Sequence, residues 1–215
     1  MHQGTTSVAL KTLNKNGNQA FDFRLDELFR EAQIMLSLKH GNLLEILGIT
    51  YLDEEKQFSL VMKWMVNGSL LDYLRKTRQD FLQSPREEVT SKLNSFARQI
   101  FEAMLFLEEK SIIHRDLAAR NCLIGENQTL KLADFGLSRF VLNPIDDRSS
   151  IQFCFSSRLT ECGLYKGNQR TIFALRWSSP EVVSSTKFSS RSDVWSYVRS
   201  KFFPMKLNEI VRSMK

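Results

Sequence analysis

The sequence predicts an α+β fold, in which strand-like runs with one helix come before a longer, mainly helical part. Three observations predict it. The longer strand-like apolar runs lie before residue 66, and one amphipathic helical stripe separates the first of them from the rest. A second, longer amphipathic stripe covers residues 89–107. A polar loop at residues 114–121 follows it and leads into two further short apolar runs.

Length and composition bound the class of protein. A chain of 215 residues holds one large domain or two small lobes. An apolar fraction of 42% and a charged fraction of 25% are typical of globular proteins. The sequence has no run of about 18 apolar residues, so it predicts no transmembrane segment. Residues 1–7 do not resemble a secretory signal. Three cysteines without zinc-ligand spacing favour a reducing, cytoplasmic location, with any membrane association left to parts outside this chain.

The net charge of +6 is distributed unevenly. Residues 1–147 hold 18 Lys/Arg and 20 Asp/Glu, whereas residues 148–215 hold 12 and 4. A basic C-terminal third is one feature of nucleic-acid-binding proteins, but no aromatic-glycine RNA motif or zinc knuckle accompanies it. We therefore expect no nucleic-acid partner, and we interpret the charge as a basic loop and tail that favour acidic peptides.

The first predicted element is a strand over residues 7–13, because apolar and polar residues alternate there. After a turn-rich loop, a helix is predicted from a stripe of apolar residues at Phe21, Leu25, Leu28, Ala32 and Met35. Glu31 borders this stripe and needs a cation, since an unpaired buried charge is costly. Lys11 is the obvious partner, and Glu27, one turn earlier, is the rival glutamate.

The next elements lead to the polar loop. Two strands are predicted over residues 43–50 and 58–65, and Ser69 is a plausible cap for the helix that follows. Residues 79–88 are polar, contain a proline and are predicted to form a loop. The amphipathic stripe at 89–107 then predicts a helix that delivers the chain to the polar loop.

The polar loop, His-Arg-Asp-Leu-Ala-Ala-Arg-Asn at residues 114–121, is the predicted catalytic loop. Asp116 is placed to accept a proton from a hydroxyl, and Asn121 is placed to hold a divalent metal. Two short strands at 122–124 and 130–133 lead to Asp134, which Phe135 and Gly136 follow. A strand, a turn and a second strand would bring Asp116, Asn121 and Asp134 to one cleft.

These motifs resemble the signature set of the protein kinases. The set comprises the 114–121 loop, Asp-Phe-Gly at 134–136, Val-Ala-Leu-Lys at 8–11 and Ser-Pro-Glu at 179–181. The loop is similar to that of the protein-tyrosine kinases, since Ala118 stands where serine/threonine kinases usually carry lysine and Arg120 resembles the tyrosine-kinase substitute. The resemblance implies a kinase-like two-lobe fold, with a small lobe of antiparallel sheet and one helix and a larger, mainly helical lobe. It also implies ATP and Mg²⁺ as cofactors, and transfer of the ATP γ-phosphoryl group to protein tyrosines.

The resemblance also implies roles for the site residues. Lys11, held by Glu31, would contact the phosphates, and Asn121 and Asp134 would hold Mg²⁺. Asp116 would act on the tyrosine hydroxyl and Arg120 would steady that geometry. The residues implied to bind ATP are Ala9, Lys11, Met62, Lys63, Met65, Leu123 and Asp134.

The activation segment that the resemblance implies contains Tyr165, the candidate phosphorylation site, with Arg115 as the partner of its phosphate. Asp193 would brace the catalytic loop. Protein substrates bearing tyrosine are the implied partners, and phosphotyrosine-binding signalling proteins are a second class.

The chain also departs from the family pattern. No Gly-x-Gly-x-x-Gly occurs, the segment at 140–164 is longer than usual, and the similarity stops after Tyr197. We therefore expect a kinase fold truncated at both ends: residues 1–66 as a partial small lobe, 67–197 as a partial large lobe, and 198–215 as a divergent tail. The alternative function is a non-catalytic kinase-like module that binds partners or regulates a full-length kinase.

Overall fold

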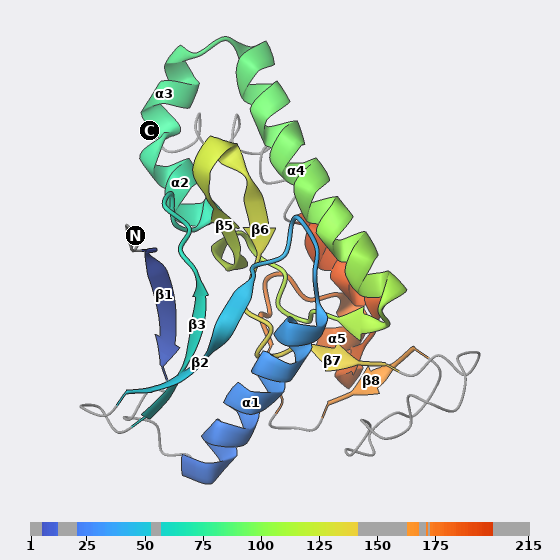
Figure 1. Cartoon of the computed structure of the whole chain (residues 1–215). Coiled ribbons are helices and arrows are strands. Elements are labelled where there is room, and N and C mark those ends of the chain that lie inside the picture. The colour runs from blue at the N-terminus through green and yellow to red at the C-terminus, as the bar shows by residue number, and fades with distance from the viewer. Residues whose placement is uncertain are drawn as a thin grey trace, which may run out of the picture.

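The computed structural model describes residues 6–12, 21–52, 57–141, 163–167, 171 and 173–199. The predicted α+β fold is confirmed. Figure 1 shows a small sheet with helix α1 at one end and a helical part around α4 at the other. Within the described residues, no helix combines the length and the apolar character needed to cross a membrane.

The small sheet has three antiparallel strands in the order β1-β3-β2. They are β1 (Val8–Thr12), β2 (Ile46–Leu52) and β3 (Gln57–Lys63), and Lys11 lies opposite Leu60 in the register of β1 and β3. Helix α1 (Phe21–Ser37) packs against β2 and β3 through the predicted stripe, whose members Leu28, Ala32 and Met35 are buried. The alternation in β1 therefore leaves Lys11 pointing to the side on which α1 lies.

The large lobe begins with α2 (Leu70–Lys76), which Ser69 caps by accepting a hydrogen bond from the backbone N–H of Asp72. Helices α3 (Arg78–Gln83) and α4 (Arg86–Glu109) follow. The prediction of a loop over residues 79–88 is wrong, since only the stretch around Ser84 and Pro85 is non-helical.

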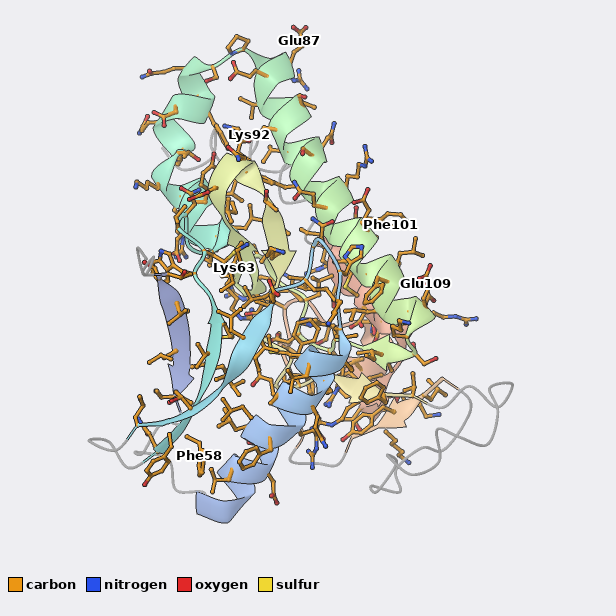
Figure 2. All side chains as sticks on the ribbon, viewed as in Figure 1. Phe58, Lys63, Glu87, Lys92, Phe101 and Glu109 are labelled. Carbon is orange, nitrogen blue, oxygen red and sulfur yellow. The ribbon has the colours of Figure 1, made fainter. Side chains whose placement is uncertain are left out.

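Aromatic packing explains the missed helix. In α3, the Phe81 ring lies 6.5 Å from that of Tyr73, and the ammonium of Lys92 on α4 lies 5.6 Å from the Phe81 ring centroid. Figure 2 shows Lys92 between the two arms of this helical hairpin. Such contacts are between elements, so a polar local sequence does not reveal them.

Short strand pairs hold the polar loop. Strands β5 (Cys122–Ile124) and β6 (Leu130–Leu132) pair antiparallel as predicted, and β4 (Ile112–Ile113) pairs with β7 (Arg139–Phe140). Two 3₁₀ turns, η1 (Ala119–Asn121) and η2 (Glu126–Gln128), complete the region. The backbone N–H of Leu44 donates to the carbonyl of Leu132 over 2.8 Å, and this bond ties the segment before β2 to the large lobe.

The last described elements pack around a second core. Strand β8 (Tyr165–Lys166) pairs with β9 (Lys187–Phe188), and α5 (Pro180–Ser185) lies between them in sequence. Buried Ile113, Val141, Val182 and Phe188 form this second core. Residues 190–199 are helical, and the hydroxyl of Tyr197 donates to the carbonyl of Ala97 on α4 over 3.1 Å. Most of the long 140–164 segment and the tail from residue 200 lie outside the described residues.

Candidate active site

Lys11 joins two carboxylates that come from different parts of the chain. Its Nζ donates to both oxygens of Glu31 over 2.7 and 2.8 Å and to Oδ1 of Asp134 over 2.8 Å. Glu31, not Glu27, is therefore the glutamate of α1 that contacts this lysine. Lys11 comes from β1, Glu31 from α1 and Asp134 from the segment after β6, so the cluster connects the sheet to the large lobe.

Burial and mutual attraction set the charges of this cluster. Burial raises the pKa of Glu31, although Lys11 opposes the rise. Burial alone would lower the pKa of Lys11, but Glu31 and Asp134 outweigh it, and the net pKa of Lys11 is raised. Burial would likewise raise the pKa of Asp134, but Lys11 lowers it overall. The lysine is thus a firmly charged cation within this cluster.

The polar loop gathers the remaining predicted side chains. The guanidinium of Arg120 forms an ion pair with Asp116, four residues earlier. Asn121 Nδ2 donates to the backbone oxygen of Asp116 over 2.7 Å and to its Oδ2 over 2.8 Å. Because the amide nitrogen of Asn121 is occupied by Asp116, its amide oxygen is the atom that can serve a cation.

Buried groups fix the shape of this loop. The carboxylate of Asp193 accepts backbone hydrogen bonds from His114 over 2.6 Å and from Arg115 over 2.9 Å. Burial raises the pKa of Asp193 to about 7. Arg115 has a φ of 70° and Asp134 a φ of 65°, a left-handed conformation that costs energy for residues with a side chain. The two anchored N–H groups stabilise the first of these turns.

His114 connects the loop to the segment that bears Asp134. Burial lowers the pKa of this fully buried imidazole, so the neutral form is favoured. Nε2 lies 3.2 Å from the carbonyl of Ala133, and Nδ1 accepts the backbone N–H of Asp116 over 3.3 Å. A neutral ring with its proton on Nε2 satisfies both contacts. Its edge meets the Phe135 ring at a centroid distance of 5.2 Å.

The other residues predicted to bind ATP lie around the junction of the two lobes. Ala9 and Met62 are cross-strand partners in β1 and β3, and both are half-buried. Leu123 is bridged to Ser69. Met65 is buried, whereas Lys63 is exposed at the end of β3. The segment after Met65 meets the strand that carries Leu123, because the backbone N–H of Asn67 donates to the carbonyl of Ile124 over 2.9 Å.

Tyr165 lies against the cation that was predicted to receive its phosphate. The Arg115 guanidinium carbon lies 4.4 Å from the Tyr165 ring centroid and 4.1 Å from that of Phe188. Burial, followed by the neighbouring charge of Arg139, lowers the pKa of Arg115 to about 10, so it stays protonated at neutral pH.

Sequence reasoning missed two residues of the site. Arg139 lies 5.8 Å from the Tyr165 ring, and Trp177 lies 5.5 Å from the guanidinium carbon of Arg120. Neither position carries a local signal, because both contacts join segments that are far apart in the sequence.

Comparison with known proteins decides the family. The family model described as protein tyrosine and serine/threonine kinase matches residues 1–199 of this chain. The chain belongs to the protein tyrosine and serine/threonine kinase family. The kinase-like assignment made from the motifs is thereby confirmed, and the ion pairs described above lie within the matched part.

Tyrosine kinases are among the relatives. The kinase chain is 38% identical to human tyrosine-protein kinase ABL2 over 192 residues, which are 89% of this chain and 14% of the relative. It is 34% identical to tyrosine-protein kinase Btk of Drosophila melanogaster, over 91% of this chain and 21% of the relative. It is 35% identical to tyrosine-protein kinase Abl of the same fly, over 89% and 10%. The chain therefore spans about a fifth or less of the length of these relatives.

Proposed function

We propose that this chain carries the catalytic centre of a protein-tyrosine kinase, which transfers the γ-phosphoryl group of ATP to tyrosine hydroxyls of proteins. The observations that carry the proposal are the Lys11 bridge to Glu31 and Asp134 and the Asp116–Arg120 ion pair; Asp116 and Asp134 both act electrostatically on His114. Phosphoryl transfer depends mainly on positioning and on neutralising charge, and this arrangement supplies both.

The residues present fit a magnesium ion. Asp134 offers a carboxylate and Asn121 an amide oxygen, and both are the hard oxygen donors that Mg²⁺ prefers. Among the described residues, no group of three His, Cys, Asp or Glu side chains could enclose a metal. Two protein ligands suit Mg²⁺, which keeps waters and substrate phosphates in its shell. When bound, the ion would neutralise charge on the phosphates, while Lys11 would bind and orient them.

Asp116 is the proposed general base. Its carboxylate would receive the proton of the substrate phenol while Arg120 and Asn121 hold it in place through the ion pair and hydrogen bonds described above. Arg120 in turn lies over Trp177, so the base is linked to the segment leading into α5. We place the adenine against Ala9, Met62, Lys63, Met65 and Leu123.

We also propose that Tyr165 is phosphorylated and that Arg115 and Arg139 bind the phosphate. Arg115 is buried, and its Nε has no hydrogen-bond partner in the part of the chain that the structure describes. A phosphate oxygen would supply one, with charge-assisted strength. Mass spectrometry after incubation with ATP, compared with Tyr165→Phe, tests this. Phosphate found only on other tyrosines would contradict the assignment.

The proposed limits of the lobes are residues 1–66 and 67–197, with 198–215 as a separate tail. We propose tyrosine-bearing proteins as substrates and phosphotyrosine-binding signalling proteins as further partners. We also propose a reducing, cytoplasmic location, because the three cysteines lack zinc-ligand spacing and are odd in number.

A phosphate-transfer assay tests the activity. Radiolabelled ATP, Mg²⁺ and a tyrosine copolymer should give label that disappears in Asp116→Asn, while a serine-only copolymer should receive none. Thermal unfolding of the variant should match the wild type, which separates lost chemistry from lost folding. Label equal to that of the variant would overturn the catalytic proposal and leave the non-catalytic binding module as the function.

A further inference from the structure

The carboxylate of Asp116 is held through both of its oxygens. Oδ1 pairs with Nη2 of Arg120, and Oδ2 accepts a hydrogen bond from Nδ2 of Asn121 over 2.8 Å. Asn121 is buried, so packing fixes its side of the carboxylate. The orientation of the carboxylate therefore depends on how firmly Arg120 is held. A general base needs this control, because it must stay within hydrogen-bond reach of the proton that it accepts.

The ion pair alone gives Arg120 only a weak hold. Arg120 lies four residues after Asp116, and the two side chains are 40% and 13% exposed. Exposed pairs with this spacing contribute little, because water screens them and the long side chain loses conformational freedom when it is fixed. A second contact on the guanidinium would keep it on the carboxylate.

Trp177 provides this second contact. The guanidinium carbon of Arg120 lies 5.5 Å from the centroid of the Trp177 ring, within the range of a cation–π interaction. Tryptophan is the aromatic side chain that attracts a cation most strongly, and the planar guanidinium stacks on such rings. Arg120 thus lies against both a carboxylate and an indole ring.

Trp177 is itself fixed, in a turn at residues 175–177. Its backbone N–H donates to the carbonyl of Ala174 over 2.9 Å. Its own carbonyl accepts a hydrogen bond from the hydroxyl of Ser196 over 2.7 Å, and Ser196 is buried. The backbone on both sides of the ring is therefore bonded, so the ring is a fixed support for Arg120.

We propose that Trp177 is a positioning residue for phosphoryl transfer. Its ring holds Arg120, and Arg120 holds the carboxylate of Asp116 toward the acceptor tyrosine. The inference rests on the proposed function. In this arrangement Trp177 acts through Arg120 and not on the reacting atoms. Losing the ring should therefore lower kcat and leave the KM for ATP unchanged, because the Lys11 cluster belongs to other elements.

Steady-state kinetics of a double-mutant cycle test this role, with radiolabelled ATP, Mg²⁺ and a tyrosine copolymer. Trp177→Leu should lower kcat roughly three- to tenfold at an unchanged KM for ATP. Trp177→Phe keeps an aromatic face and should recover part of the loss. In an Arg120→Gln background, Trp177→Leu should cause no further loss, because the cation that the ring holds is gone. A general loss of folding would persist in that background.

The matched control is Trp195→Leu. Trp195 is 41% exposed and lies in the helical residues 190–199, so the same change there should leave kcat at the wild-type value. Urea unfolding follows the contact without any catalysis. The midpoint shift of the Trp177→Leu/Arg120→Gln double variant should be smaller than the sum of the two single shifts. If Trp177→Leu does not fold, Trp177→Phe replaces it in both cycles.

The outcomes separate this inference from the proposed function. Wild-type label combined with multiplicative losses of kcat in the double variant would overturn the role of Trp177 and leave the proposed function intact. An absence of wild-type label would overturn the proposed function and the positioning role together. Additive midpoint shifts would, in either case, show that Trp177 does not hold Arg120.

Discussion

At the scale of single residues, three ionisable groups control the site through burial. Glu31, His114 and Asp193 are each at most 4% exposed. Each is tied by hydrogen bonds to a segment far away in sequence: Glu31 to Lys11, His114 to Ala133, and Asp193 to the backbone of the catalytic loop. Removing one member of such a pair therefore leaves a buried polar group without its partner, which lowers the free energy of unfolding more than replacing both members would.

The first prediction concerns Lys11→Met. The variant leaves Glu31 buried without its cation, and we expect the free energy of unfolding to fall by about 1–3 kcal/mol at pH 8, a value discounted because Lys11 is partly exposed. The pKa of Glu31, already raised, rises further. A raised carboxyl pKa favours folding while the group is protonated, so the deficit should shrink at pH 5. Urea unfolding at both pH values measures it.

The matched control for that experiment is the double variant Lys11→Met/Glu31→Gln. A neutral amide at position 31 needs no cation, so most of the lost stability should return at pH 8. Equal deficits of Lys11→Met at pH 5 and pH 8 would show that the lysine matters through packing and not through this ion pair.

The second prediction concerns Asp193→Asn. Asparagine places an NH₂ group against one of the two backbone N–H donors, so we expect a loss of about 1–3 kcal/mol. Burial raises the pKa of Asp193 to about 7. At pH values between the ordinary pKa of aspartate and about 7, the unfolded chain has released this proton while the folded chain keeps it. The difference in unfolding free energy between the wild type and the variant should therefore decrease as pH rises. Exposed Asp72→Asn is the control, and an advantage that grows with pH would contradict the assignment.

At the scale of elements, local pattern predicted the strands and long helices, and contacts between elements decided the rest. Strands β1, β5 and β6 and helix α1 follow from periodicity, because one face of β5, β6 and α1 is buried and alternate residues of β1 are half-buried. Helix α3 was missed because its Phe81 packs on Tyr73 of the previous helix. The left-handed backbone at Asp134 and the approach of Arg139 to Tyr165 depend on tertiary packing, which no local spacing encodes.

The third prediction concerns the start of α2. Ser69 Oγ accepts the N–H of Asp72 over 3.1 Å and donates to the Asp72 carboxylate over 2.6 Å. Ser69→Ala removes both contacts, and we expect a loss of about 1 kcal/mol in the free energy of unfolding. Ser69→Thr keeps a hydroxyl and should lose only a small part of it. Urea unfolding of the two variants checks this. Equal losses of unfolding free energy in Ser69→Ala and Ser69→Thr would show that the hydrogen bonds of the hydroxyl do not stabilise the helix.

At the scale of the whole molecule, the two lobes are connected at a few well-defined points. Lys11 reaches Asp134 across the junction, and the backbone of Leu44 bonds to that of Leu132. The α+β division was predictable because apolar periods differ between the two halves of the sequence. The second core around Val182 and Phe188 was not predictable, since charge composition does not specify contacts.

The fourth prediction follows from this junction. A nucleotide that binds both lobes should stabilise the folded state by RT ln(1 + [L]/Kd), about 2.7 kcal/mol at a hundredfold excess over Kd, and raise the unfolding temperature by several degrees. Mg²⁺ with a non-hydrolysable ATP analogue should give the full shift, and EDTA should remove the magnesium-dependent part. Asp134→Asn should abolish that part because it removes the proposed carboxylate ligand, while Asp72→Asn should not. A full shift in Asp134→Asn would show that the ion is held elsewhere, since the amide oxygen of Asn121 alone is a weak ligand for a hard dication.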